Sequence, residues 1–205
     1  NINFYILQNV LQLLNLYISP LSKNNMNIIQ TPLKDLLVIE PKVFEDDRGH
    51  FFESWNKEIF ERQGLKLDFL QDNQSLSSKG VLRGLHFQNP PYAQGKLVRV
   101  IQGSVMDVAV DIRKNSPTYG EYFSIKLSGK NKTSIWIPPG FAHGFVTLED
   151  DTIFTYKCTA VYNKESEGSI FWNDKDLNID WGMQNPIISE KDAFSPTFSI
   201  LKSEF

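Results

Sequence analysis

The stretch KLVRVIQ-G-SVMDVAVDI, from Lys96 to Ile112, decides the fold. Gly103 separates two apolar segments that are rich in valine and isoleucine, and these residue types favour strands. We therefore predict successive β-strands over Lys96–Gln102 and Ser104–Ile112, with a turn at the glycine.

Segments of the same kind extend outward from this centre. Turn signals such as Pro138-Pro139-Gly140 separate them. Short strands at such regular spacing indicate a β-sandwich or a closed barrel. The further predicted strands are Leu36–Ile39, Phe51–Trp55, Gly80–Phe87, Tyr122–Leu127, Thr133–Ile137, Phe141–Thr147, Thr152–Ala160 and Gly168–Trp172, with an extended segment at Leu67–Asp72.

Helical signals are few and short. Lys57–Gln63 predicts a short helix that Gly64 ends, and Ser189–Ala193 predicts one helical turn. An acidic turn is expected over Glu45–Gly49, before the first of these helices.

Composition narrows the functional classes. The 205 residues suit one domain of ordinary size, and a formal charge of −3 gives no general attraction to nucleic acid or to a membrane. The one cysteine, Cys158, excludes an internal disulfide and agrees with a reducing cytoplasm. Because Cys158 lies in a predicted strand, we interpret it as a small buried apolar residue rather than a nucleophile.

The first 25 residues differ from the rest. Asn and Gln interrupt their leucines repeatedly, and no basic segment precedes the apolar part, so they match neither a signal peptide nor a membrane span. We interpret residues 1–25 as an extension of non-native or upstream origin, and residues 26–205 as the domain. The alternative is an extra helix or strand that packs on the domain.

The three histidines are His50, His86 and His143. Jelly-roll barrels of the cupin type often bind a metal through His-x-His on one strand and a later histidine after a Pro-x-Gly turn. Pro138, Gly140 and His143 match the second part, but Gln88 stands where the first part needs its second histidine. Two separated imidazoles make a poor metal site, so we expect no metal.

Seven stretches form a set: EPKVFEDDRGHFFES at 40–54, QDN at 71–73, VLRGLHFQ at 81–88, QGKLVR at 94–99, DVAVDIR at 107–113, WIPPGFAHGFVT at 136–147 and WND at 172–174. Together they closely resemble the dTDP-4-dehydrorhamnose 3,5-epimerase family. The resemblance covers the chain from about Met26 to the Ser189–Asp192 region.

The resemblance implies an all-β, cupin-like jelly-roll barrel with short peripheral helices. It implies a cytoplasmic homodimer with no metal or other cofactor and with a dTDP-sugar substrate. The implied reaction inverts C3 and C5 of dTDP-4-dehydro-6-deoxy-D-glucose and gives dTDP-4-dehydro-L-rhamnose, in dTDP-L-rhamnose biosynthesis.

The family motifs also imply catalytic roles. His86 matches the base, Asp192 its carboxylate partner, Lys96 the cation that stabilises the enolate, and Tyr156 the acid that returns the proton. A ketone at C4 acidifies the protons on both neighbouring carbons, and an imidazole suits their removal near neutral pH.

Further positions match substrate contacts of the family. Arginine suits a diphosphate, because its planar fork offers paired donors, and Tyr162 matches the position that stacks on thymine. The matched positions are Arg48, Glu53, Gln71, Asn73, Arg83, His143, Tyr162, Glu167 and Lys191. We interpret Asp107, Asp111 and Arg113, which alternate along one strand, as a structural charge network.

Three alternatives stay open at this point, and one of them is a metal-dependent cupin oxygenase. A sister enzyme of the same fold would epimerise only C3 or only C5, and it could keep both His86 and Tyr156. A non-catalytic cupin that only binds a sugar nucleotide would have no need of the histidine, aspartate, lysine and tyrosine together.

Overall fold

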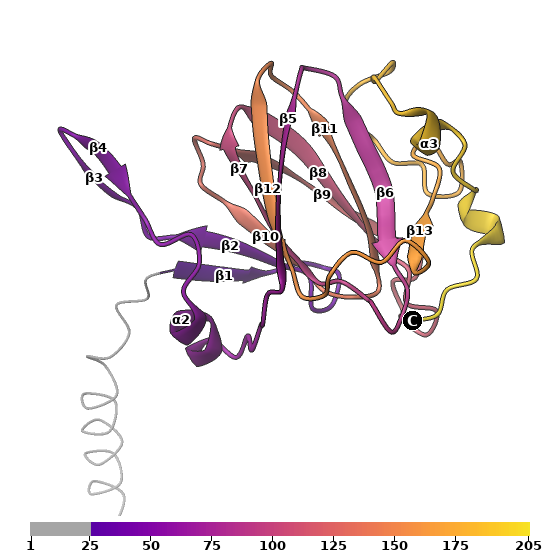
Figure 1. Ribbon diagram of the computed structural model, residues 1–205, viewed down its shortest axis with the longest axis horizontal. Coiled ribbons are helices and arrows are strands. Elements are labelled where there is room, and N and C mark those ends of the chain that lie inside the picture. The colour runs from indigo at the N-terminus through magenta and orange to yellow at the C-terminus, as the bar shows by residue number, and fades with distance from the viewer. Residues whose placement is uncertain (1–25) are drawn as a thin grey trace, which may run out of the picture.

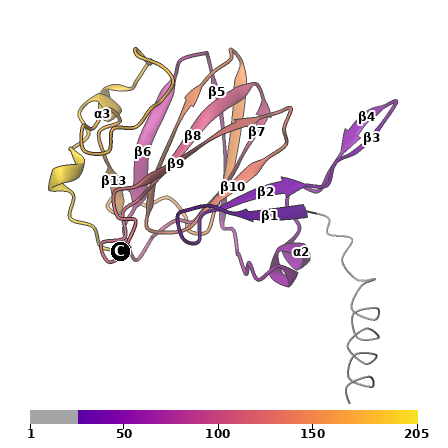
Figure 2. The same cartoon turned by 180° about the vertical axis from the view of Figure 1, so that it is seen from behind.

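Two facing sheets form the body of the computed structural model, which describes residues 26–205 (Figures 1 and 2). The first sheet has the order β1-β2-β10-β7-β12-β5, with strands Met26–Gln30, Leu37–Pro41, Ser134–Ile137, Lys96–Gln102, Thr152–Cys158 and Gln71–Ser77. The second has the order β13-β6-β11-β8-β9, with strands Glu167–Ser169, Leu82–Gln88, Phe141–Thr147, Ser104–Asp111 and Tyr122–Ser128.

The strand pairs in both sheets are antiparallel, and from β5 to β8 the chain changes sheet at each step. This is jelly-roll connectivity. Helices α2 (Lys57–Arg62) and α3 (Glu190–Ala193) and a 3₁₀ turn at Phe198–Ile200 lie at the periphery. The predicted all-β, cupin-like jelly roll with short peripheral helices is therefore confirmed. The separate extension predicted for residues 1–25 lies outside the described residues.

The predicted strands Lys96–Gln102 and Phe141–Thr147 have the observed bounds, but the N-terminal part differs. Here a two-stranded hairpin, β3 (Phe44–Asp46) paired with β4 (Gly49–Phe51), projects from the body (Figure 1). We call it the arm. The strand predicted at Phe51–Trp55 is wrong, because Oδ1 of Asp46 accepts the Arg48 N–H at 2.9 Å and fixes a tight turn one step earlier.

Hydrophobic side chains pack in three layers. One cluster fills the space between the sheets and includes Val98, Leu127 and Phe154. A second covers the outer face of the second sheet, where Trp181 and the C-terminal segment pack. A third lies under α2, around Phe60. Central strands are therefore covered on both faces, and every residue of β11 is buried.

Two glycines let β6 and β11 approach closely. A Cβ on Gly84, whose φ is +132°, would lie 2.5 Å from Cα of Gly144, and a Cβ on Gly144 would lie 2.9 Å from the Arg83 carbonyl oxygen. Both positions adjoin a β-bulge between the two strands. Larger residues would force the strands apart.

This close approach predicts a large loss of stability in Gly84→Ala. The methyl group adds a backbone clash to the strain of a positive φ, so we expect the free energy of unfolding to fall by about 3 kcal/mol or more. Gly49→Ala is the matched control, because Gly49 has a similar φ of +127° and open space around it. It should lose about 1 kcal/mol. Equal losses in urea unfolding would show that the contact between the strands is unimportant.

Candidate active site

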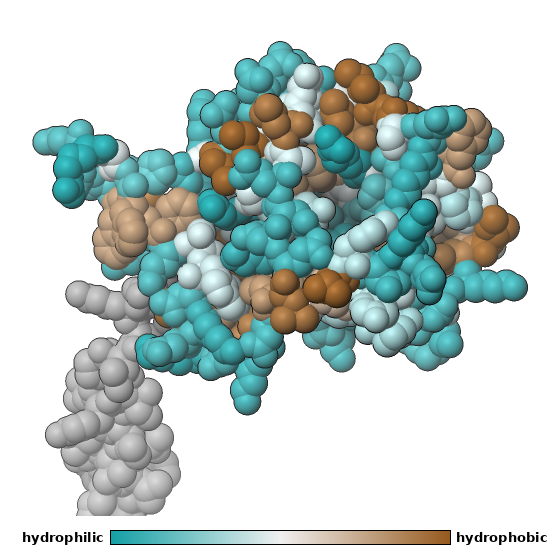
Figure 3. Space-filling model, viewed as in Figure 1, coloured by the Kyte–Doolittle hydropathy of each residue, from teal (hydrophilic) through white to brown (hydrophobic). Residues whose placement is uncertain are grey.

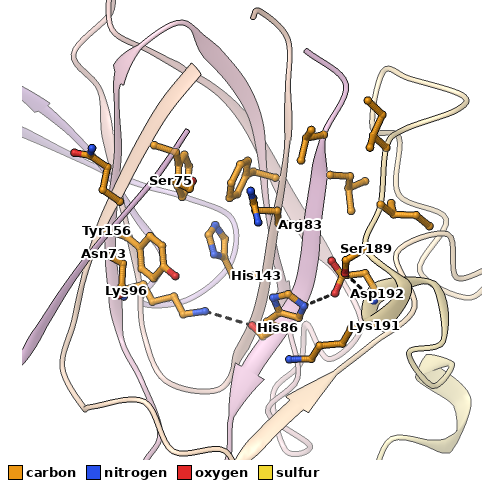
Figure 4. A pocket seen from close by; sticks show the side chains of 17 residues that line it. Asn73, Ser75, Arg83, His86, Lys96, His143, Tyr156, Ser189, Lys191 and Asp192 are labelled. Carbon is orange, nitrogen blue, oxygen red and sulfur yellow. Dashed lines mark hydrogen bonds and ion pairs between the residues drawn. The ribbon is translucent and has the colours of Figure 1, made fainter. Parts of the chain in front are cut away.

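A cavity of about 550 Å³ opens between the two sheets. Figure 3 views the molecule from the side used in Figure 1, and Figure 4 shows the cavity from close by. Tyr156 and Lys96 come from the first sheet, while His86 comes from the second. Asp192 reaches the cavity from α3. The four predicted catalytic side chains therefore line one space.

His86 and Asp192 form a hydrogen-bonded pair. Nε2 of His86 lies 2.6 Å from Oδ1 of Asp192, and the Gly84 N–H lies 3.5 Å from the other carboxylate oxygen. Burial by itself raises the pKa of Asp192, but the hydrogen bond and charge of His86 and the bond from Gly84 outweigh it and hold the pKa below its usual value. An ionised carboxylate only accepts, so in a neutral His86 imidazole Nε2 carries the proton and Nδ1 has the lone pair.

The C-terminal segment carries Asp192 to this place. Ile187 pairs with the start of β6: the Leu82 N–H donates to the Ile187 carbonyl at 2.9 Å, and the Ile187 N–H donates to Gly80 at 2.7 Å. Ser189 then caps α3 by accepting the Asp192 N–H on its hydroxyl. The cap fixes the short helix so that the aspartate, only 3% exposed, points inward.

A β-bulge sets the direction in which the side chains of Arg83 and His86 point. His143 of β11 pairs with His86 of β6, and Phe145 pairs with Arg83, so β6 has one extra residue between these pairs. Strict alternation would place Arg83 and His86 on opposite faces of the sheet. Because of the extra residue both line the cavity, while Leu85 packs into the outer cluster.

Lys96 and Tyr156 stand opposite the histidine. The Lys96 ammonium lies 3.5 Å from the His86 carbonyl oxygen and 6.0 Å from the centre of the Tyr156 ring. Burial lowers the pKa of Lys96, and the negative charges of Asp107 and Glu167 partly offset this shift. Burial also raises the pKa of Tyr156, so the phenol keeps its proton.

A second pair lies deeper in the cavity wall. Nε2 of His143 is 2.9 Å from Oδ2 of Asp107, and both residues are buried. The interpretation of Asp107 as part of a structural charge network is therefore wrong. Asp111 does form such a network with Arg113, Ser116 and Thr118. The sequence alone does not show that the two aspartates have different partners, because the partners depend on which residues of other elements face each aspartate.

Most of the predicted substrate contacts gather nearby. Arg83, Asn73, His143 and Lys191 line the main cavity. A smaller cavity of about 260 Å³ adjoins it, shares Asn73, His86, Lys96 and Tyr156 with it, and adds Gln71, Tyr162 and Glu167.

These polar groups are joined by hydrogen bonds. Gln71 accepts the Tyr162 N–H at 2.7 Å, and Glu167 accepts from the Tyr162 hydroxyl at 3.1 Å and from Lys191 at 2.5 Å. Tyr162 itself is 54% exposed.

Arg48 and Glu53 do not join the others. Arg48 lies on the arm and pairs with Asp46 there, and its side chain is 90% exposed. Glu53 follows the arm and accepts a hydrogen bond from Asn56. Neither residue lines the cavities that hold His86.

The sequence analysis did not predict some of the residues that line the cavity. Ser75 and Ile187 line it, as do Phe145 and Phe154, whose rings stack 3.8 Å apart. Within residues 26–205 no group of three or more His, Cys, Asp or Glu side chains is placed to hold a metal ion. No described helix is both long and apolar enough to cross a membrane.

Comparison with known proteins shows the family to which the chain belongs. A family model described as dTDP-4-dehydrorhamnose 3,5-epimerase matches residues 30–199. A dTDP-4-dehydrorhamnose 3,5-epimerase of Shigella flexneri is 56% identical over 174 residues, which are 84% of this chain and 96% of the relative. One of Methanothermobacter thermautotrophicus is 52% identical over 167 residues, or 80% and 90% of the two chains.

Solved structures agree. The crystal structure of dTDP-6-deoxy-D-glucose-3,5-epimerase from Legionella pneumophila, in complex with dTDP-4-keto-L-rhamnose, is 49% identical with a TM-score of 0.83. The match covers 86% of this chain and 95% of that one.

The buried Asp192 carboxylate predicts a specific dependence of stability on pH. Its pKa is lower in the folded protein, so its contribution is present above about pH 4, the ordinary aspartate pKa, and is lost as the pH falls through the folded value. Asp192→Asn should therefore reduce the free energy of unfolding by about 1 to 3 kcal/mol near neutral pH. The gap from the wild type should narrow as the pH falls below about 4.

Urea unfolding at several pH values measures this gap. Asp176→Asn serves as the control, because the Asp176 side chain is exposed and makes no hydrogen bond to a described residue. Its curve should run parallel to that of the wild type. A gap for Asp192→Asn that stays constant between about pH 6 and pH 2 would contradict the assignment.

Proposed function

Because this chain belongs to the dTDP-4-dehydrorhamnose 3,5-epimerase family, we propose that it inverts C3 and C5 of dTDP-4-dehydro-6-deoxy-D-glucose in the cavity between its sheets. The product is dTDP-4-dehydro-L-rhamnose. The observation that carries the proposal is the His86–Asp192 pair, which faces Lys96 and Tyr156 across one cavity.

His86 is the base. The C4 ketone acidifies the hydrogens on C3 and C5, and Nδ1 of His86 takes such a hydrogen as a proton. The C–H electron pair then forms a double bond to C4, and the ketone oxygen becomes an enolate oxygen. Asp192 fixes the tautomer and stabilises the imidazolium that forms.

Lys96 and Tyr156 complete the reaction. The buried ammonium stabilises the enolate oxygen, and the low polarity around it strengthens that attraction. Tyr156 stands on the sheet opposite His86, so its phenol returns a proton to the opposite face of the ring. The burial that raises its pKa keeps this proton in place until the enolate accepts it.

The nucleotide binds at the more exposed end. Arg83 and Lys191 offer positive charge for the diphosphate, and the ring of Tyr162 offers a face for thymine. Gln71, Asn73 and Glu167 supply polar groups around them. His143 lies on the sugar side, next to His86.

The active assembly is a homodimer in this proposal. Arg48 and Glu53 match substrate contacts of the family, yet they lie on or next to the arm, which extends away from the cavity of its own chain (Figures 1 and 3). Phe44 and Phe51 on the arm are 51% and 67% exposed, as expected of a surface that a partner covers. An arm that reaches the cavity of a second copy would bring Arg48 to the diphosphate there.

The cytoplasm is the proposed location. The single cysteine is buried and needs no oxidising compartment. A pathway that makes dTDP-L-rhamnose from nucleotide sugars is the proposed context.

The first test of the function is deuterium uptake. Purified protein in D₂O with dTDP-4-dehydro-6-deoxy-D-glucose, and with no reductase present, should place deuterium at both C3 and C5, as read by NMR. His86→Asn should lower conversion by about 100-fold or more, because it removes the base, while dTDP still binds. Label at one carbon only in the wild type would mean a mono-epimerase, and no label would refute the proposed reaction.

The second test addresses the arm. Arg48→Ala should lower kcat/KM by about 10- to 100-fold, because a charged contact to the diphosphate is lost. Mixing this variant with His86→Asn under conditions that exchange subunits should then restore activity, to about a quarter of the wild-type value, since half of the sites in a mixed dimer are intact. If Arg48 serves the cavity of its own chain, no mixed site is intact and mixing restores nothing.

A further inference from the structure

We propose that Ser75 binds the 2-hydroxyl of the sugar and thereby restricts the enzyme to dTDP-4-dehydro-6-deoxy sugars that keep this hydroxyl. The inference rests on the proposed function and deepens it, because it names a class of substrate. Ser75 lies outside the stretches that carry the family resemblance.

Ser75 belongs to a row of polar side chains on the inner face of β5. Residues two apart on a strand point to the same side, so Asn73, Ser75 and Ser77 face the space between the sheets. Asn73 and Ser75 both line the main cavity. Figure 4 shows Ser75 on the same wall as Asn73 and Tyr156, across the cavity from Arg83. The row is therefore placed to contact a ligand in the cavity.

The side chain of Ser75, unlike its neighbours in this row, has no hydrogen-bond partner within the described part of the chain. Asn73 accepts from Gln71 at 2.9 Å, and Ser77 accepts from Nη2 of Arg83 at 3.2 Å. Oγ of Ser75 is buried and makes no such bond. A buried hydroxyl without a partner carries a free-energy cost, so its presence requires an explanation.

Packing does not require a serine at this position. The cross-strand partner of Ser75 is Phe154, whose ring stacks on that of Phe145 at 3.8 Å, so the surroundings on this side are apolar. Alanine would fit the same space without the cost of an unpaired hydroxyl. Rotation about the Cα–Cβ bond is enough to bring the hydroxyl to an oxygen atom that enters the cavity. The partner of this hydroxyl is therefore the ligand.

The position of Ser75 favours the sugar over the nucleotide. Tyr162 and Gln71, at the end proposed for the nucleotide, line the smaller cavity, whereas Ser75 lines the main cavity and not the smaller one. Arg83 and Lys191 already offer positive charge to the diphosphate. A single neutral hydroxyl beside phenyl rings is a poor site for an anion but suits a neutral hydroxyl of the sugar.

The chemistry of the sugar favours its 2-hydroxyl. The substrate has hydroxyls on C2 and C3 only, because C4 is a ketone and C6 is a methyl group. Inversion at C3 moves the 3-hydroxyl to the other face of the ring, whereas the 2-hydroxyl keeps its configuration. A hydrogen bond from Ser75 to the 2-hydroxyl can therefore persist through both inversions and hold the ring in place while C3 and C5 react.

The test compares two ligands that differ only at C2. dTDP-6-deoxy-D-glucose and its 2-deoxy analogue carry a 4-hydroxyl in place of the ketone, so both bind without turnover. By isothermal titration calorimetry, the wild type should bind the first about 10- to 100-fold more tightly. Ser75→Ala should bind the two within about threefold of each other and should bind dTDP as the wild type does. An unchanged preference in Ser75→Ala would overturn the assignment, as would an equal loss of affinity for dTDP.

Ser77→Ala is the matched comparison, because Ser77 lies on the same face of the same strand and bonds to Arg83. Loss of that bond leaves the guanidinium less well placed for the diphosphate. It should therefore weaken dTDP and both sugar nucleotides by one common factor, and the preference for the 2-hydroxyl should remain. If Ser77→Ala removed the preference as completely as Ser75→Ala, the assignment to Ser75 would be wrong.

Stability separates a contact with the ligand from a structural role. Without ligand, Ser75→Ala removes a buried hydroxyl that has no partner in the described part of the chain. Its free energy of unfolding in urea should therefore equal or exceed that of the wild type. Ser77→Ala breaks a hydrogen bond and should be less stable. A loss in Ser75→Ala that exceeds the loss in Ser77→Ala would show that the hydroxyl supports the fold, and it would overturn the proposal.

The role of Ser75 and the epimerase function fail in different ways, because the affinities are measured without turnover. A wild type that labels both C3 and C5 in D₂O but binds the two ligands equally would refute the role of Ser75 alone. A wild type that labels neither carbon would refute the epimerase function, whatever the affinities.

Discussion

The hydrogen bond between His86 and Asp192 can form only if several distant parts of the fold are in place. Its partners are separated by 106 residues, so a segment after the last strand must return to the start of β6. Pairing of Ile187 with β6, the cap at Ser189 and the packing of Trp181 on the outer face make this return possible. The irregular C-terminal part therefore positions Asp192 as firmly as the strands position His86.

Burial acts on the cavity groups in ways that suit their different tasks. It lowers the pKa of Lys96 and raises that of Tyr156, because burial disfavours the charged form of each side chain. For the tyrosine this preserves a proton that can be donated. For the lysine it would remove the useful charge, and the negative charge at Asp107 and Glu167 opposes that loss. Asp107 and Glu167 thus favour the charged form of Lys96.

Most of the strands are predictable from the sequence because they depend on local patterns, and the family motifs identify many of the side chains that line the cavity. Lys96–Gln102 and Phe141–Thr147 lie in segments where apolar residues and turns agree, and their bounds are as observed. The bulge beside His86 follows from contact between Gly84 and Gly144, which no local pattern encodes. The role of Asp107 likewise depends on which residue faces it across strands, and the arm on a turn that Asp46 fixes.

The groups proposed to bind the nucleotide and the groups proposed to transfer protons lie at different ends of the cavity. Exposed groups such as Tyr162 and Lys191 lie at the end proposed for the nucleotide, while His143, Asp107 and Lys96 lie where water is scarce. Contacts to a nucleotide do not change during proton transfer, so they stabilise ground state and transition state alike unless they hold the sugar against the deeper groups. In the proposed mechanism, the exposed end of the cavity therefore contributes to the rate by holding the sugar against the buried groups.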